Sequence, residues 1–103
     1  EKVVTWYMSS ETYHSKFKKM HSAYEECRAD TTALYLSHFK EPYEIMFSGR
    51  EDEWDDIQYV MWYEVARRGL YGLSFYDVET ETWGQAHVNG NYVIMRVLYE
   101  VDG

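Results

Sequence analysis

The clearest pattern in the sequence is a run of apolar and aromatic residues with helical spacing in its first third. Between about Thr12 and Phe39, steps of three and four residues alternate at Tyr13, Phe17, Met20, Tyr24, Cys27, Thr31, Leu34 and Tyr35. Residues spaced in this way lie on one face of an α-helix, so the pattern predicts one long helix. Because the residue before a proline disfavours helix, we expect this helix to end near Lys40 or Glu41, ahead of Pro42.

A second helical pattern follows a turn predicted at residues 48–50. Five of the six residues 51–56 are acidic, and acids at a helix N-terminus interact favourably with the positive end of the helix dipole. The solvated start of a helix is the simplest interpretation of this cluster. One face of the helix then holds Ile57, Met61, Glu64, Val65 and Arg68. Gly69 and Gly72 weaken the pattern but need not end the helix.

The last third of the chain fits two local structures. Asn89-Gly90, between two apolar stretches, is a typical hairpin turn. A helix face is instead formed by Trp83, Ala86, His87, Val93, Ile94, Val97, Leu98 and Val101. The local pattern alone leaves hairpin and helix open.

Composition limits the class of protein. The 103 residues are 46% hydrophobic and 18% aromatic, which is typical of a globular chain of one domain or less. The net charge of −8 argues against a nucleic-acid partner. No apolar run approaches the roughly 18–20 residues of a membrane span, so we expect no membrane partner. Cys27 is the only cysteine, which favours a reducing compartment, and we expect a cytoplasmic protein. The sequence starts at Glu1, with neither an initiating methionine nor a signal-peptide pattern, so residues 1–103 are expected to be a single fragment of a larger protein.

The candidate chemistry lies in residues 25–30, Glu-Glu-Cys-Arg-Ala-Asp. On a helix Glu26 and Asp30 are one turn apart and project together, whereas Glu25 points about 100° away. Glu26 borders the apolar stripe, where a carboxylate needs either a cation or a metal ion as partner. Arg28 is one candidate cation, so the local pattern leaves an ion pair and a metal site open.

A separate metal site is a weaker alternative on the same helix. His14 and His21 are seven residues apart, and His21 precedes Glu25 by four. This spacing places the three side chains along one helix face. Exposed helical histidines are common, so surface residues without a metal are the simpler interpretation.

The six residues 25–30 resemble a signature motif of the dipeptidyl peptidase III family of zinc metallopeptidases. The resemblance covers nearly the whole chain, in order and with few gaps. It implies a mainly α fold of three to four helices, part of the larger helical zinc-binding lobe of a two-lobed peptidase. It also favours a helix at Asn89-Gly90. Other similar segments are Thr5-Trp6-Tyr7, Ser10-Glu11-Thr12, Ser15-Lys16-Phe17, Leu34-Tyr35-Leu36, Gly69-Leu70, Phe75-Tyr76, Trp83, Gln85-Ala86-His87 and Val93-Ile94-Met95-Arg96-Val97-Leu98.

The resemblance implies a zinc-dependent exopeptidase that releases dipeptides from the amino-terminus of short peptides. In such an enzyme Glu26 is a ligand of one zinc ion (Zn²⁺). The other ligands are two histidines of an upstream His-Glu-x-x-Gly-His helix that is not present in this chain. Glu25 and Asp30 match carboxylates that orient those histidines. His87 matches a catalytic histidine that stabilises the developing oxyanion.

The resemblance also implies substrate-binding positions and two departures. Arg96 matches an arginine near the substrate cleft. His14 stands at a position where the family has an acidic residue, and Asn91 where it has an arginine, so both are expected to alter peptide binding. The chain alone is expected to be catalytically inactive, with Glu26 facing a cleft or solvent and lacking a strong partner. Its partners are then short peptides and the rest of the parent peptidase. The alternative is an inactive or repurposed relative that binds peptides or small molecules.

Overall fold

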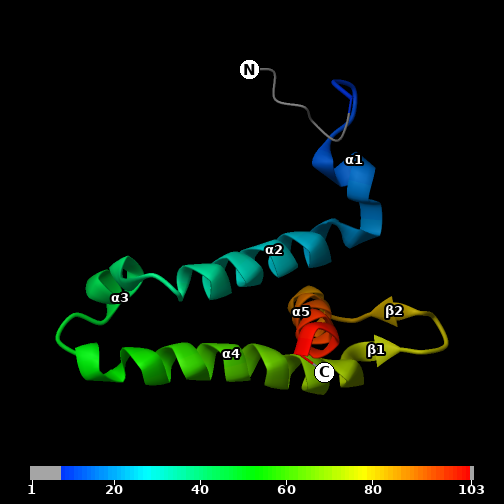
Figure 1. The fold of residues 1–103 in the computed structure, drawn as a ribbon. Coiled ribbons are helices and arrows are strands. Elements are labelled where there is room, and N and C mark those ends of the chain that lie inside the picture. The colour runs from blue at the N-terminus through cyan, green and yellow to red at the C-terminus, as the bar shows by residue number, and fades with distance from the viewer. Residues whose placement is uncertain (1–7, 103) are drawn as a thin grey trace.

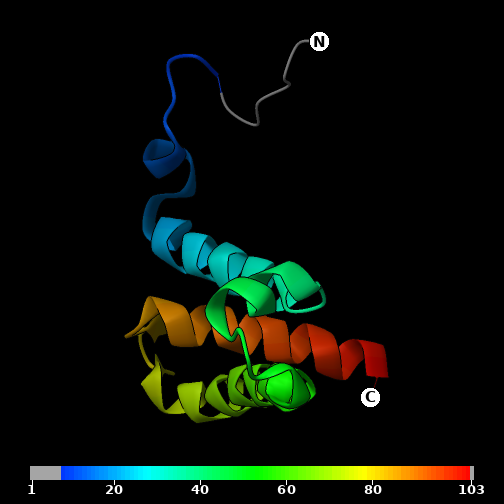
Figure 2. The ribbon, with the colours of Figure 1, turned by 90° about the vertical axis from the view of Figure 1, so that its left-hand side faces the viewer.

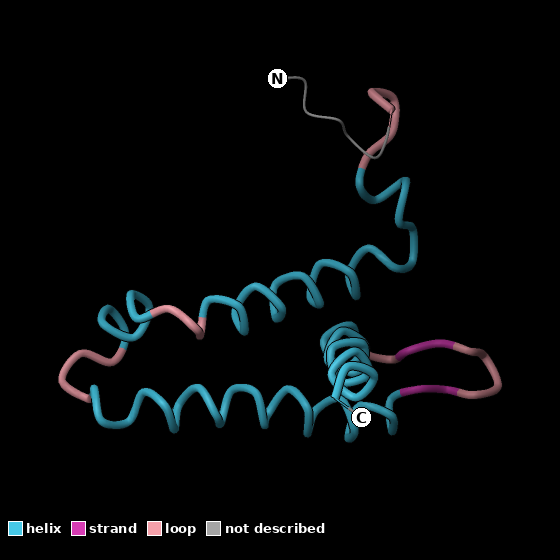
Figure 3. Tube along the Cα trace, in the orientation of Figure 1, coloured by secondary structure: helices cyan, strands magenta, loops and turns pink. Residues whose placement is uncertain are grey.

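The computed structural model describes residues 8–102 and is mainly helical, as expected (Figures 1 and 3). Residues 1–7, which include the similar segment Thr5-Trp6-Tyr7, lie outside the described part. The α-helices are α1 (Tyr13–Phe17), α2 (His21–Leu36), α3 (Lys40–Met46), α4 (Trp54–Tyr71) and α5 (Ala86–Asp102). Short 3-10 helices are η1 (Lys18–Met20), η2 (Glu51–Glu53) and η3 (Gly72–Phe75), and two short strands are β1 (Tyr76–Asp77) and β2 (Thr82–Trp83). No helix among the described residues is long and apolar enough to cross a membrane.

Helix α5 lies between α2 and α4 (Figure 2). Its packing against these two helices makes up most of the tertiary structure in the described residues. The short α3 joins α2 to α4 at one end, and the β1–β2 hairpin joins α4 to α5 at the other (Figure 1). The chain therefore brings the start of α5 against the middle of α2, although the two are far apart in the sequence.

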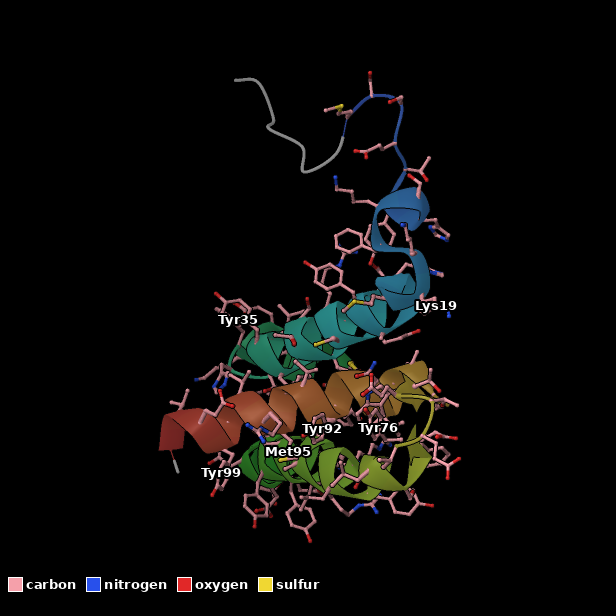
Figure 4. The ribbon with its side chains drawn as sticks, turned by 90° about the vertical axis from the view of Figure 1, so that its right-hand side faces the viewer. Lys19, Tyr35, Tyr76, Tyr92, Met95 and Tyr99 are labelled. Carbon is pink, nitrogen blue, oxygen red and sulfur yellow. The ribbon has the colours of Figure 1, made fainter. Side chains whose placement is uncertain are left out.

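Two glycines allow the backbones of these helices to approach closely. A Cβ atom on Gly90 of α5 would lie 3.0 Å from the backbone N and Cα atoms of Cys27 in α2. A Cβ atom on Gly69 of α4 would lie 2.6 Å from the Cβ atom of Met95 and 2.8 Å from the carbonyl oxygen of Asn91. Met95 projects from α5 toward α4 (Figure 4). Glycine inside a helix costs about 1 kcal/mol relative to alanine, and here the close packing explains its presence.

The Asn89-Gly90 pair is therefore helical, as the family resemblance implies, and forms no turn. Both residues lie in the first turns of α5. The hairpin signal fails because the apolar face of α5 and the contact of Gly90 with α2 outweigh the local turn preference. The hairpin that the structure does contain is β1–β2, which pairs Tyr76 with Trp83 and was not predicted.

The helix predicted from Thr12 to Phe39 starts as expected, with Thr12 as the N-cap of α1, but it is not continuous and it ends too late. Lys18 has a φ of 49°, a conformation that separates α1 from η1 and α2. The second helix ends at Leu36, and the extended backbone of Phe39 begins α3. Pro42 lies in the first turn of α3 rather than after a helix, because first-turn positions need no backbone N–H donor.

The predictions for the middle of the chain are confirmed. Gly49 forms the expected turn with a φ of 80°, and the acidic residues after it lead into α4. Helix α4 continues through Gly69 and reaches Tyr71, so Gly72 ends it as a cap.

The described residues bury few large apolar side chains. The buried hydrophobic residues among them are Leu34, Tyr43 and Ile94. Many others are exposed, among them Tyr35, whose side chain projects away from α5 (Figure 4). A fold of this size that leaves so much apolar surface in contact with water presents faces suited to packing against further protein.

Candidate functional site

Two polar pairs join α2 to α5 on one side of their contact. The carboxylate oxygen Oε2 of Glu26 lies 3.3 Å from Nδ1 of His87. One turn further along both helices, Nδ2 of Asn91 donates a hydrogen bond of 2.6 Å to Oδ2 of Asp30. Both pairs join residues 61 positions apart in the sequence. We call these two pairs, together with the Gly90–Cys27 contact between them, the α2–α5 seam.

The Glu26–His87 pair is accessible to solvent. The side chains are 35% and 54% exposed, respectively. An exposed pair of this kind contributes little to stability, about 0–1 kcal/mol, and is charged on both sides only when the imidazole is protonated. Glu26 therefore lacks a strong partner among the described residues, as expected, because the exposed His87 ring does not lock it in place.

Arg28 does not pair with Glu26. Its guanidinium contacts the Glu25 carboxylate at 2.7 Å, on the exposed face of α2. This hydrogen bond with Glu25 raises the pKa of the Arg28 guanidinium above its usual value. The alternative in which Arg28 pairs with Glu26 is therefore not found among the described residues, because Arg28 binds Glu25 instead.

Asn91 is the most buried polar residue described, with 1% of its surface exposed. Its amide nitrogen is bound by Asp30, whereas its amide oxygen Oδ1 has no hydrogen-bond partner among the described residues. The Asp30 side chain is only partly buried. The structure therefore places Asn91 inside the helix packing, in contact with Asp30.

A cavity of about 570 Å³ lies where the end of α4 meets the start of α5. Its lining includes Arg67, Arg68, Gln85 and His87. The Glu64 carboxylate binds Arg67 at 2.7 Å and Arg68 at 2.9 Å. These hydrogen bonds, above all the one from Arg67, lower the pKa of Glu64 to about 2. His87 thus contacts Glu26 and also borders an open cavity with a charged wall.

The other candidate substrate residues lie away from the two pairs. Arg96 binds Glu100 at 2.7 Å on an exposed part of α5. His14 belongs to α1, and its ring centroid is 4.3 Å from that of His21 at the start of α2. The substrate-binding roles of Arg96, His14 and Asn91 stay predictions.

Glu26 is the carboxylate of residues 25–30 that fits a metal ligand best. Glu25 accepts a hydrogen bond from Arg28 and Asp30 accepts one from Asn91, whereas Glu26 has only the exposed His87 ring, at 3.3 Å, as a partner among the described residues. Carboxylate oxygen is an ordinary ligand of zinc. Between residues 8 and 102 no three histidine, cysteine, aspartate or glutamate side chains are grouped to hold an ion, the His14–His21 region included. A metal ion bound by Glu26 would therefore need further ligands from elsewhere.

The Asp30–Asn91 pair was not expected from the sequence. The signal that would have found it is the equal spacing of the partners, since Glu26 and Asp30 are four residues apart and so are His87 and Asn91. A spacing of four places each pair of polar residues on one side of its helix. If the two helices pack with their chains running in the same direction, the first residues of the two pairs can meet, and so can the second residues.

Comparison with known proteins gives one consistent match. The model of peptidase family M49 matches residues 1–103. The chain is 45% identical over 100 residues to dipeptidyl peptidase 3 of Nematostella vectensis and 45% identical over 101 residues to that of Homo sapiens, in each case over 97% of the chain. It is 37% identical over 93 residues to dipeptidyl peptidase 3 of Dictyostelium discoideum, over 86% of the chain. The chain spans 13–14% of the length of these relatives. Because the family model matches the whole chain, the chain belongs to peptidase family M49.

Proposed function

We propose that residues 1–103 are part of the zinc-binding lobe of a cytoplasmic peptidase that releases dipeptides from the amino-terminus of short peptides. The observation that carries the proposal is the α2–α5 seam, which brings Glu26 within 3.3 Å of His87. The names of the relatives, dipeptidyl peptidase 3, support the proposed reaction.

Glu26 is proposed to supply one ligand to a zinc ion whose other ligands come from outside this chain. A zinc ion with an open coordination position lowers the pKa of bound water and polarises a carbonyl group. Within the chain, Glu25 and Asp30 flank Glu26 on α2 and are proposed to orient the other ligands through hydrogen bonds.

His87 is proposed to act on the substrate beside the metal ligand. Its Nδ1 atom is turned toward Glu26, so Nε2 is the ring nitrogen left to meet a peptide. A donor held beside the reacting carbonyl stabilises the charge that develops on its oxygen. The neighbouring cavity, lined in part by Arg67 and Arg68, gives a peptide room beside this ring.

The test of the metal site is the replacement Glu26→Ala in the full-length protein. Glu44→Ala is the matched control, since Glu44 is exposed on α3 away from the seam. We expect Glu26→Ala to lose bound zinc, measured by metal analysis of the purified protein, and to lose dipeptide release. Glu44→Ala keeps both. Retained zinc and turnover in Glu26→Ala would show that the ligand assignment is wrong.

The test of His87 separates transition-state from ground-state effects. His87→Ala is expected to lower kcat by about 10²- to 10³-fold, the range for a lost oxyanion donor, with a much smaller change in KM. A large rise in KM with kcat preserved would instead assign His87 to substrate positioning. If the wild-type protein binds peptides but releases no dipeptide, the peptide-binding alternative replaces the enzyme.

A further inference from the structure

Among the described residues, the Asp30–Asn91 hydrogen bond combines a short distance with a buried donor. It joins two different helices at 2.6 Å, and its donor residue is 1% exposed. Hydrogen bonds to an ionised carboxylate are shorter and stronger than those between neutral groups. The contact is therefore a strong and well-defined link between α2 and α5.

Stability alone does not account for an asparagine at this position. The Oδ1 atom of Asn91 is buried without a hydrogen-bond partner among the described residues, which costs free energy. Asp30 is only partly buried, so water can solvate its carboxylate without help from Asn91. An apolar side chain of similar volume would fill the same space without an unpaired oxygen. The amide is thus better explained by what it does to Asp30.

The Asn91 side chain is a rigid donor because its backbone is held from two sides. The residue before it, Gly90, packs against the backbone of Cys27 in α2. The carbonyl group of Asn91 itself faces Gly69 in α4. Nδ2 binds one carboxylate oxygen of Asp30, Oδ2, and no other hydrogen bond to Asp30 side-chain oxygens occurs among residues 8–102. Oδ1 of Asp30 is left as an acceptor.

From this geometry we infer that Asn91 is a positioning residue for the metal site. It holds the Asp30 carboxylate by Oδ2, so that Oδ1 is presented to the N–H group of a metal-binding imidazole supplied from outside this chain. Asp30 and Glu26 are one turn apart on the same side of α2, which places this acceptor next to the proposed ligand. The inference rests on the zinc site proposed above and adds the residue that orients Asp30.

A thermodynamic cycle in the full-length protein tests the inference. The zinc dissociation constant of Asn91→Ala, Asp30→Ala and the double variant is measured by competition with a chromophoric chelator. Losing a group that orients a metal ligand weakens binding by about 10- to 100-fold, and we expect this for Asp30→Ala. Asn91→Ala should weaken zinc binding less, by about 3- to 10-fold, because the Asp30 carboxylate is still present and only its orientation is less restricted. The double variant should bind zinc no more weakly than Asp30→Ala, since Asn91 acts through Asp30.

Two further variants separate positioning from simple damage to the fold. Tyr43→Phe lowers stability away from the α2–α5 seam, because it removes a buried hydrogen bond of 2.9 Å to the Ser37 carbonyl, and it keeps the Asn91 amide. We expect it to lower the thermal midpoint while the zinc dissociation constant stays within about 2-fold of wild type. Asn91→Leu keeps a side chain branched at Cγ and removes the donor, so it should weaken zinc binding like Asn91→Ala with helical circular dichroism unchanged.

The inference is overturned by any of three results. In the first, Asn91→Ala and Asn91→Leu bind zinc like the wild type while Asp30→Ala binds it weakly. In the second, the effects of Asn91→Ala and Asp30→Ala add in the double variant. In the third, Tyr43→Phe weakens zinc binding as much as Asn91→Ala does. In each case the zinc site itself still stands. Unchanged zinc binding in Glu26→Ala would instead remove the site, and the inference with it.

Discussion

The contact between α4 and α5 at Gly69 leads to a quantitative prediction about stability. A Cβ atom added there would lie 2.6 Å from the Cβ atom of Met95 and 2.8 Å from the carbonyl oxygen of Asn91. Ordinary contact for such atoms begins at 3.4 Å, so the new carbon is about 0.6–0.8 Å too close. Neither neighbour is the end of a flexible side chain. In Gly69→Ala the helix α5 must therefore move as a whole.

The expected net loss is about 1–2 kcal/mol of unfolding free energy. Overpacking of a well-packed contact typically costs about 1–3 kcal/mol, and contacts of 2.6 and 2.8 Å place this one in the upper part of that range, at about 2–3 kcal/mol. Alanine recovers about 1 kcal/mol of this through its higher helix propensity. Out of a total stability of about 5–15 kcal/mol for a typical domain, the change is readily measured.

Urea denaturation followed by circular dichroism measures this loss. The midpoint should fall in Gly69→Ala while the m-value, which reports the surface exposed on unfolding, stays constant. The other glycines provide a graded series of controls. Gly72→Ala, with contacts of 3.0 and 3.1 Å to Val88, should lose less, and Gly84→Ala, with one contact of 3.5 Å, should stay within about 0.5 kcal/mol of wild type. If Gly69→Ala is as stable as the wild type, or if the order is reversed, close approach does not explain the glycine.

Three further predictions concern single contacts. Because Arg67 and Arg68 lower the pKa of Glu64 from 4.5 to about 2, their stabilisation is complete above pH 4.5 and is lost as the pH falls toward 2; an acid titration of Glu64→Gln should show less loss of stability over that range than the wild type. Tyr43→Phe removes a buried hydrogen bond of 2.9 Å to a backbone carbonyl and should cost about 0.5–1.5 kcal/mol in thermal or urea unfolding; an unchanged midpoint would contradict this. Thr12→Ala removes the capping box of α1 and should speed amide hydrogen exchange in α1, by the equivalent of about 1 kcal/mol, without changing exchange in α5; equal acceleration in both helices would refute a local role.

The sequence predicted the helices whose evidence is contained in the helix itself. Repeated apolar steps of three and four residues identified α2 and α4, and the acidic residues 51–56 marked the start of α4. The positive φ of Gly49 agrees with the predicted turn. These features depend on local backbone preferences and side-chain periodicity, which a one-dimensional pattern contains.

The breaks between helices were not predictable in this way. Nothing in the sequence around Lys18 indicates its φ of 49°, since lysine has no preference for that conformation. Pro42 alone indicates that a helix ends nearby, but proline is equally compatible with the first turn of the next helix, where the structure places it. Asn89-Gly90 carries a real turn preference, which packing of Gly90 against Cys27 overrides.

The sequence by itself determined that Glu26 and Asp30 share one side of a helix, because the four-residue spacing fixes their relative direction. Only the tertiary structure decided which groups they meet. His87 and Asn91 come from 61 residues further along the chain, and they reach α2 because Gly90 lets the two backbones approach closely and Gly69 does the same on the side of α4. Partner choice across such a distance depends on how three helices pack together, a property of the whole fold that no local pattern contains.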